Sequence, residues 1–155
     1  MIQLCRSISD VSGMLRLFVY TKGKDMIEIH GWLRVEATYK NEDMLSQAET
    51  DSIMKSAVDI LSVCGRKGDM RCANGCVYIN TLHCSNHRTA EVDELIGMYT
   101  RISETATGSY GMLYIRDDED ERYYNGFQVY IFRKGICIRR NDTDFSPCIP
   151  VIEDE

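Results

Sequence analysis

The most constraining stretch of this sequence is an apolar run that stops at five consecutive carboxylates. Met112 to Ile115 is apolar at nearly every position, which is typical of a central strand in a sheet. We expect the acids that follow to be exposed, because each buried carboxylate would need a partner or a raised pKa. The sequence therefore predicts a central strand that delivers an acidic loop to the surface. The five acids are Asp117, Asp118, Glu119, Asp120 and Glu121.

Length and charge limit the classes of protein that this chain can be. Its 155 residues are most simply one domain, with a net charge of −6 and a pI near 5.1. A nucleic-acid binder draws much of its affinity from Lys and Arg on phosphates, so the charge argues against that class. No apolar run approaches the ~20 residues that a membrane-spanning helix needs. The first residues lack a long apolar segment typical of a secretory leader, so we expect a cytoplasmic protein.

Hydrophobic periodicity predicts an α+β fold. Strict alternation from Ile27 to Tyr39 predicts a strand with one wet face, on which Trp32 is the exception. Further strands are expected at 76–82, 109–116 and 127–133, with a short hairpin partner at 136–139. Apolar residues at helical spacing predict two helices, the first beginning at Ser46 in a capping box with Glu49.

These elements predict a single mixed or antiparallel sheet of about four to five strands with two helices packed on one face. The strand order is not determined by the pattern. A clean strand begins just after Met26, so we expect residues 1–25 to be an N-terminal extension and 26–155 to be a single α+β domain. Arg66 to Arg71 reads as a basic loop, and 142–155 as an irregular terminus.

Three groups of residues could carry chemistry. The acids at 117–121 could bind Mg²⁺ in a phosphoesterase, although carboxylates for such a site normally converge from separate elements. A zinc site built from Cys72, Cys76, Cys84 and His87 has unusual spacing, and extended chain would separate its halves. A Cys–His nucleophile has no evident oxyanion hole. We therefore expect no metal, no cofactor and no enzymatic activity.

Four segments of the chain together resemble the bacterial family called immunity protein 7. The resemblance covers roughly Met26 to Asp154, and its most specific part is the third segment. It implies a cytoplasmic, non-enzymatic α+β protein that binds and neutralises a toxin domain, often a nuclease, encoded beside it in a polymorphic toxin system. The four segments are His30-Gly31-Trp32, Asn86-His87-Arg88, Gly108 to Asp120, and Phe145 to Pro150.

A toxin that grips phosphate needs a basic cleft, which an acidic loop could plug or flank. Clustered charge sets association rate and orientation, so aromatic anchors are expected to supply affinity. The candidate toxin-binding residues are Asp117, Asp118, Glu119, Asp120, Glu121, Tyr123, Tyr124 and Trp32. The expected partner is a basic C-terminal nuclease domain of the toxin. We expect this chain to be a monomer or weak dimer in isolation. The alternatives are a solvated loop whose acids pair with Arg116, a divalent-metal phosphoesterase, and a small-molecule-binding regulatory domain.

Overall fold

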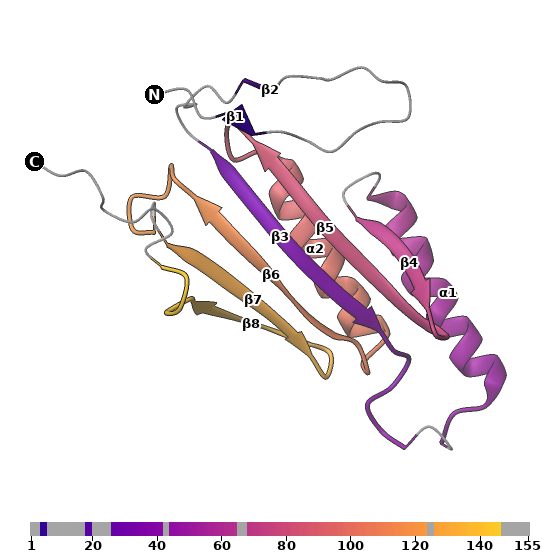
Figure 1. The fold of residues 1–155 in the computed structure, drawn as a ribbon. Coiled ribbons are helices and arrows are strands. Elements are labelled where there is room, and N and C mark those ends of the chain that lie inside the picture. The colour runs from indigo at the N-terminus through magenta and orange to yellow at the C-terminus, as the bar shows by residue number, and fades with distance from the viewer. Residues whose placement is uncertain are drawn as a thin grey trace, which may run out of the picture.

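The computed structural model describes residues 26–41, 44–64, 68–123 and 126–146, together with two short strands nearer the N-terminus. Each helix and strand can be followed in Figure 1. In chain order the elements are β1 (Leu4–Cys5), β2 (Phe18–Val19), β3 (Ile27–Val35), α1 (Gln47–Val63), β4 (Asp69–Ala73), β5 (Cys76–Ser85), α2 (Ala90–Thr105), β6 (Tyr110–Asp117), β7 (Phe127–Arg133) and β8 (Ile136–Asn141).

The main sheet has six strands in the order β4-β5-β3-β6-β7-β8, and every neighbouring pair is antiparallel. Both α1 and α2 lie on one face of it, and β6 is an inner strand between β3 and β7 (Figure 1). The predicted α+β class and helix placement are confirmed. The predicted count of four to five strands is wrong. Neither described helix is long and apolar enough to cross a membrane.

The missed strand is β4, which occupies part of the predicted basic loop at Arg66–Arg71. All five of its residues are exposed, so no alternation of buried and exposed side chains marks it in the sequence. A tight turn at Asn74 and Gly75, both with positive φ, folds β4 onto β5. β5 also extends to Ser85, beyond the strand predicted at 76–82. A strand on the sheet edge with no buried face leaves little trace in hydrophobic periodicity.

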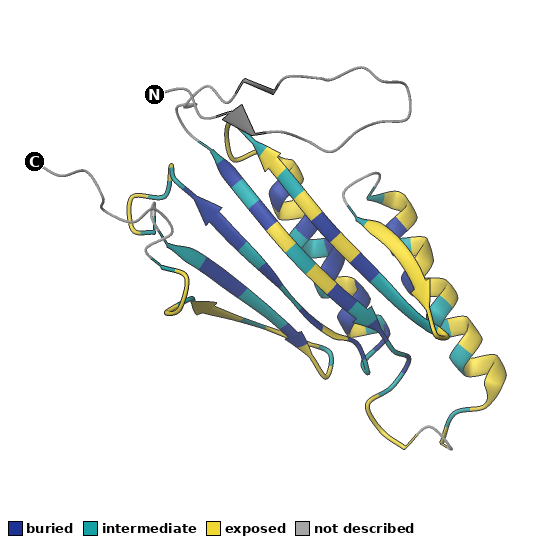
Figure 2. Ribbon diagram, viewed as in Figure 1, coloured by how far each residue is buried: buried dark blue, intermediate teal, exposed yellow. Residues whose placement is uncertain are grey.

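The core lies between the sheet and the two helices. Along β3, buried side chains alternate with more exposed ones, as the banding in Figure 2 shows. The apolar stripe of α2 packs against this buried face, with Tyr99 at its centre. The Tyr99 ring lies 5.4 Å from that of Phe132, and its hydroxyl bonds to Thr81 at 2.9 Å. Burial raises the pKa of Tyr99 to about 12, so this contact keeps its proton at neutral pH.

The first helix begins where the capping box predicts. The backbone N–H of Glu49 donates to Ser46 Oγ at 3.3 Å, and the Ser46 N–H donates to the Glu49 carboxylate at 2.8 Å. Two donors at the start of α1 are thereby satisfied within the chain. Gly65 follows the helical pattern and is the residue type that commonly ends a helix, but it lies outside the described residues.

The segment from Gly108 to Gly111 brings β6 unusually close to β3. A Cβ at Gly111 would lie 2.1 Å from the Trp32 carbonyl oxygen, and one at Gly108 would lie 2.3 Å from the Thr38 carbonyl oxygen. Between them Ser109 is fully buried, and its Oγ accepts the Glu36 N–H at 3.2 Å. These three residues therefore fix the register and the distance between the two inner strands.

Substituting Gly111 with Ala should lower the free energy of unfolding by about 3 kcal/mol, because the clashing atoms are backbone and cannot rotate away. Gly97→Ala is the matched control. Its Cβ would meet nothing within 4 Å in the middle of α2, so it should raise stability by about 1 kcal/mol. Urea unfolding of both variants checks this, and equal effects would contradict the proposed close contact.

Candidate functional site

The acidic loop, defined as Asp117 to Glu121, begins on the last residue of β6. Asp117 is only 6% exposed, so the expectation that all five acids face solvent is wrong for this residue. Its carboxylate accepts from the Arg88 guanidinium at 3.4 Å and from the Glu119 N–H at 3.2 Å. A buried carboxylate is tolerated here because a cation and a backbone donor replace its water.

Arg88, which precedes α2, connects the loop to the helix. One guanidinium nitrogen contacts Asp117, and the other contacts Asp93 in the first turn of α2 at 2.5 Å. Burial lowers the pKa of Arg88, but the hydrogen bonds and charges of the two carboxylates outweigh it and leave the pKa raised. Arg88 thus takes the structural role that the sequence suggested for Arg116, which contacts no carboxylate among the described residues.

Glu119 makes the second connection to the same segment. Its carboxylate contacts His87 Nδ1 at 2.7 Å and accepts the Arg88 backbone N–H at 3.2 Å. The hydrogen bond from His87, followed by that from the Arg88 backbone, lowers the pKa of Glu119. At neutral pH this carboxylate is therefore ionised and holds the loop against the start of α2.

The other acids divide into two bonded residues and one free residue. An Asp118 carboxylate oxygen accepts the Met26 N–H at the start of β3. The Asp120 carboxylate accepts from Gln128 at 3.3 Å and from the Arg122 N–H at 3.1 Å. Glu121 is exposed, and no described residue contacts its carboxylate. The loop is therefore held at several points and leaves Glu121 available to a partner.

A hollow of about 380 Å³ lies beside the loop, between the segment before α2 and strands β7 and β8. Arg139 forms one wall, with its guanidinium 5.8 Å from the Tyr123 ring and 5.7 Å from the Tyr130 ring. It also donates to the Gln128 side-chain oxygen. The lining residues are Arg88, Asp117, Glu119, Asp120, Tyr130 and Arg139. The lining of this hollow holds both acids and bases, so the site is a surface of mixed charge.

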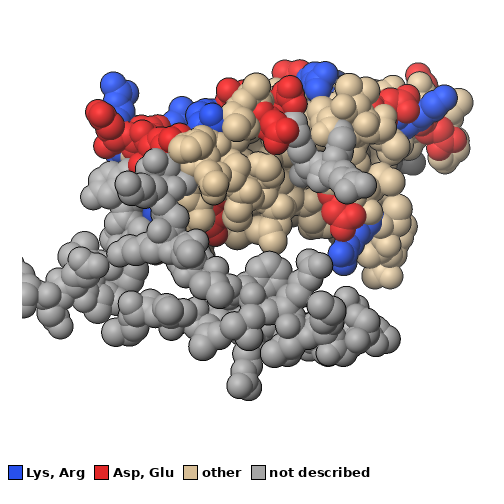
Figure 3. Space-filling view, turned by 90° about the horizontal axis from the view of Figure 1, so that it is seen from above, with Lys and Arg blue, Asp and Glu red and all other residues tan. Residues whose placement is uncertain are grey.

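The view from above shows the same mixture (Figure 3). Acidic side chains gather with basic ones close by, and residues of other kinds cover much of the surface between such groups. The acid run in the sequence therefore overstates the local negative charge, because neighbours from other segments offset part of it. Coulomb attraction to a basic partner would come chiefly from acids without a cation in contact.

The predicted aromatic anchors do not all lie together. Tyr123 is half-buried beside the loop, whereas Tyr124 lies outside the described residues. Trp32 is 37% exposed and points to the sheet face opposite the helices, away from the buried side chain of Asp117. Its ring packs edge-on against Tyr110 at 6.0 Å. The structure therefore separates Trp32 from the acidic loop.

Sequence reasoning missed Tyr110 and Arg34, which surround Trp32. The Arg34 guanidinium lies 5.8 Å from the Tyr110 ring and donates to its hydroxyl at 3.3 Å. Their alternation on β3 and β6 was visible in the sequence, but only the strand pairing reveals that they are neighbours. The contact of Arg88 with Asp117 joins residues 29 apart, and no local pattern could have identified it.

Within the described ranges, no three His, Cys, Asp or Glu side chains are arranged to hold a metal ion. The described cysteines are free thiols, and burial raises the pKa of Cys84 and of Cys137. A raised pKa favours the less nucleophilic thiol form. Four of the five carboxylates of the loop accept hydrogen bonds from protein donors, which differs from the converging arrangement that the phosphoesterase alternative requires.

A family model for immunity protein 7 matches residues 26–154. This chain belongs to the immunity protein 7 family. The resemblance noted in the sequence is thereby confirmed, and membership implies a cognate toxin as the partner. Searches of curated proteins and of solved structures gave no match.

The residues that carry the family resemblance have structural roles in this immunity protein. His87 and Arg88 hold the acidic loop, and Ser109 joins β6 to β3. Near the end of the described chain, Ser146 Oγ accepts the Phe127 N–H at 2.9 Å, and the Phe145 ring packs 6.1 Å from that of Tyr114. Three of the four segments therefore meet at the end of the sheet that bears the loop.

Substituting Glu119 with Gln should weaken the attachment of the loop to the start of α2, because it replaces a charged acceptor with a neutral one. The backbone amide of Arg88 should then exchange its hydrogen several-fold faster than in the unmodified protein. Lowering the pH should reduce the protection factor of this amide, which is the intrinsic exchange rate divided by the observed rate at the same pH, only below 4.5, since the folded pKa of Glu119 is lowered from that value.

Glu121→Gln is the control for this measurement, because it removes a neighbouring charge that contacts no described residue. Unchanged exchange at Arg88 in Glu119→Gln, or equal acceleration in both variants, would show that Glu119 does not hold the loop.

Proposed function

We propose that this immunity protein neutralises its cognate toxin domain by forming a one-to-one complex that blocks access to the toxin's active site. Family membership over residues 26–154 is the observation that carries this proposal. The toxin is proposed to be a nuclease, part of a polymorphic toxin system in which neighbouring cells deliver toxins by contact. The proposed binding unit is the 26–155 domain, to which residues 1–25 are an extension. It acts in the cytoplasm as a monomer or weak dimer.

The acidic loop is proposed to face the basic cleft of the nuclease, with Tyr123 and Tyr124 beside it. A nuclease holds phosphates with Lys and Arg, and carboxylates can take the place of those phosphates. Glu121 supports this role most directly, because it is exposed and contacts no described residue. Asp118, Glu119 and Asp120 contribute charge while they also bond within the protein. Trp32 is proposed as a separate aromatic anchor.

Rigidity of the loop favours binding. Four of its carboxylates are fixed by Met26, His87, Arg88 and Gln128. A loop that is already ordered loses little conformational entropy when a partner binds, so more of the interaction energy appears as affinity. The same bonds disfavour the phosphoesterase alternative, because a metal would have to displace a protein donor at each of these acids.

Expressing the tagged full chain with the toxin domain encoded beside it tests the function. The expected result is a stable one-to-one complex and survival of cells that the toxin domain otherwise kills. Cells that die while the protein is soluble and folded, with no complex recovered, would overturn the proposal.

Replacing Glu121 with Lys should slow association with the toxin domain by about threefold at low ionic strength, and added salt should reduce the difference. The dissociation rate constant should change less, because charges at the rim of an interface act mainly on the association rate. Glu104→Lys is the matched control, since Glu104 is an exposed acid near the end of α2 and makes the same charge change. Equal association rate constants for the two variants would exclude the loop from the interface.

A further inference from the structure

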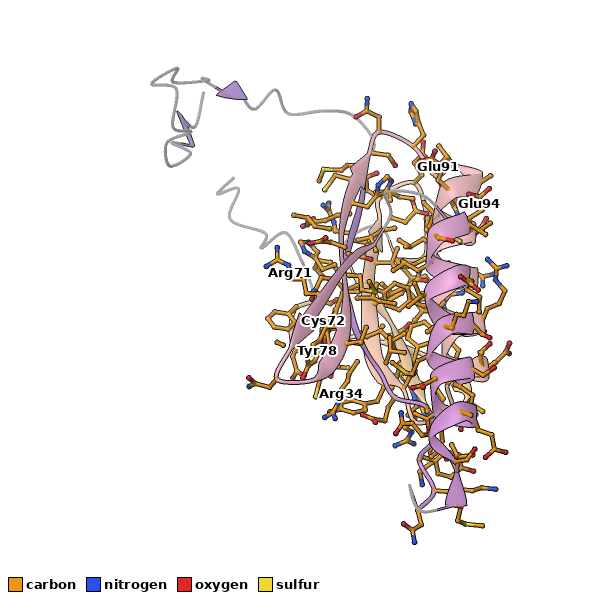
Figure 4. The ribbon with its side chains drawn as sticks, turned by 90° about the vertical axis from the view of Figure 1, so that its right-hand side faces the viewer. Arg34, Arg71, Cys72, Tyr78, Glu91 and Glu94 are labelled. Atoms are coloured by element: carbon orange, nitrogen blue, oxygen red, sulfur yellow. The ribbon has the colours of Figure 1, made fainter. Side chains whose placement is uncertain are left out.

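The sheet face opposite the helices carries a continuous row of side chains across five strands. Trp32 on β3 pairs with Asn80 on β5 and with Met112 on β6, and directly paired residues share a face. The row continues through Ile131 on β7 to Ile138 on β8. We call this side of the sheet the open face, because neither described helix covers it (Figure 4).

Large apolar side chains on the open face are exposed. Leu82 is 75% exposed, Ile136 is 54% exposed and Tyr110 is 43% exposed. Single exposed apolar residues are ordinary, but a contiguous group on one face marks an interaction surface. Trp32 completes this group at 37% exposure, beside Tyr110.

The centre of the open face has the composition of a binding hot spot. Trp, Tyr and Arg are the residue types that contribute most energy to protein interfaces. Here Trp32 packs edge-on against Tyr110, and Arg34 both stacks on the Tyr110 ring and bonds to its hydroxyl. These side chains stand on two inner strands, so they are held in place before any partner arrives.

The charge of the open face is opposite to that of the helical layer. Strand positions on this face hold five bases, Arg34, Arg71, Arg116, Arg133 and Arg140, and two acids, Glu28 and Asp69. The two helices together hold seven acids and two bases. Figure 4 shows Arg34 and Arg71 on one side of the molecule and Glu91 and Glu94 on the other.

Two of the exposed cations on this face have no carboxylate in contact within the described residues. Arg71 contacts Asp69 and Arg34 contacts Glu36, whereas neither Arg133 nor Arg140 contacts a carboxylate in the described parts of the chain. The β7–β8 hairpin from Phe127 to Asn141 holds four bases and no acid. A matching partner therefore presents an apolar patch flanked by carboxylates. A second copy meeting this face with its own open face would bring cations against cations, which disfavours that arrangement.

We propose that the open face is a second docking surface for the toxin domain, separate from the acidic loop. The apolar centre around Trp32 and Tyr110 supplies affinity, and Arg133 and Arg140 pair with carboxylates of the toxin. This inference rests on the proposed function, since it takes the cognate toxin domain as the occupant. The immunity protein then binds one toxin through an acidic loop and through a basic, aromatic face.

The test measures binding of the toxin domain to the full chain and its variants by surface plasmon resonance. Trp32→Ala should weaken binding about tenfold or more, mainly through faster dissociation. Arg140→Glu should weaken it several-fold. The protein should stay folded in this variant, because the Arg140 side chain is exposed and contacts no carboxylate in the described structure. Lys55→Glu is the matched control, because it makes the same charge change on the exposed side of α1 and should bind like the unmodified protein.

The outcomes separate the two proposals. An unmodified protein that binds no toxin overturns both of them. An unmodified protein that binds, with Trp32→Ala and Arg140→Glu binding equally well, overturns only the open-face proposal.

Sedimentation velocity of the same proteins tests whether a second copy of this chain, rather than the toxin domain, occupies the open face. A second copy could instead set its acidic helical layer against the open face, and such head-to-tail contacts build rings or open filaments. Assemblies that grow with concentration in the unmodified protein and disappear in Arg140→Glu would overturn the toxin as the occupant. A constant molecular mass for both proteins, together with weaker toxin binding by the variant, supports it.

Discussion

The close contact between β6 and β3 is the constraint on which the rest of this structure depends. Gly111 leaves room for the β3 backbone, and Gly108 leaves room for the Thr38 carbonyl just beyond that strand. Between them, the fully buried Ser109 accepts the N–H of Glu36, the residue that follows β3. This contact sets the register that pairs Trp32 with Met112 and places Tyr110 within reach of both Trp32 and Arg34. The same register pairs Asp117, the last residue of β6 and the first of the acidic loop, with Ile27 at the start of β3. One backbone contact thus positions both surfaces that we propose for toxin binding.

The carboxylates of the loop combine two roles that the sequence presents as one. Asp117 and Glu119 bind the segment before α2 through Arg88 and His87, so their first effect is to hold the loop. Only Glu121 is both exposed and free of contacts with described residues. A run of acids can therefore indicate a loop that its own carboxylates hold in place as much as it indicates a binding surface. The charge available to a partner is smaller than the run suggests, and our proposal accordingly assigns more of the affinity to the open face.

Much of the fold followed from periodicity and capping, because those signals are local. The capping box at Ser46, the alternation along β3 and the apolar stripe of α2 all appear where the pattern places them. The strand β4 was not predicted, since an exposed edge strand has no buried face to produce alternation of apolar and polar residues. Contacts between distant segments were also out of reach. Neither the role of Arg88 nor the grouping of Tyr110 with Trp32 can be obtained without the strand pairing.

The central claim is that the acidic loop and the open face together hold the toxin. Hydrogen exchange of the full chain, measured with and without bound toxin domain, tests this claim most directly. Bound toxin is predicted to slow exchange of backbone amides in the acidic loop and in the exposed edge strand β8, while the outer amides of α1 do not change. Slower exchange confined to the two helices, with β8 and the loop unaffected, would contradict the account.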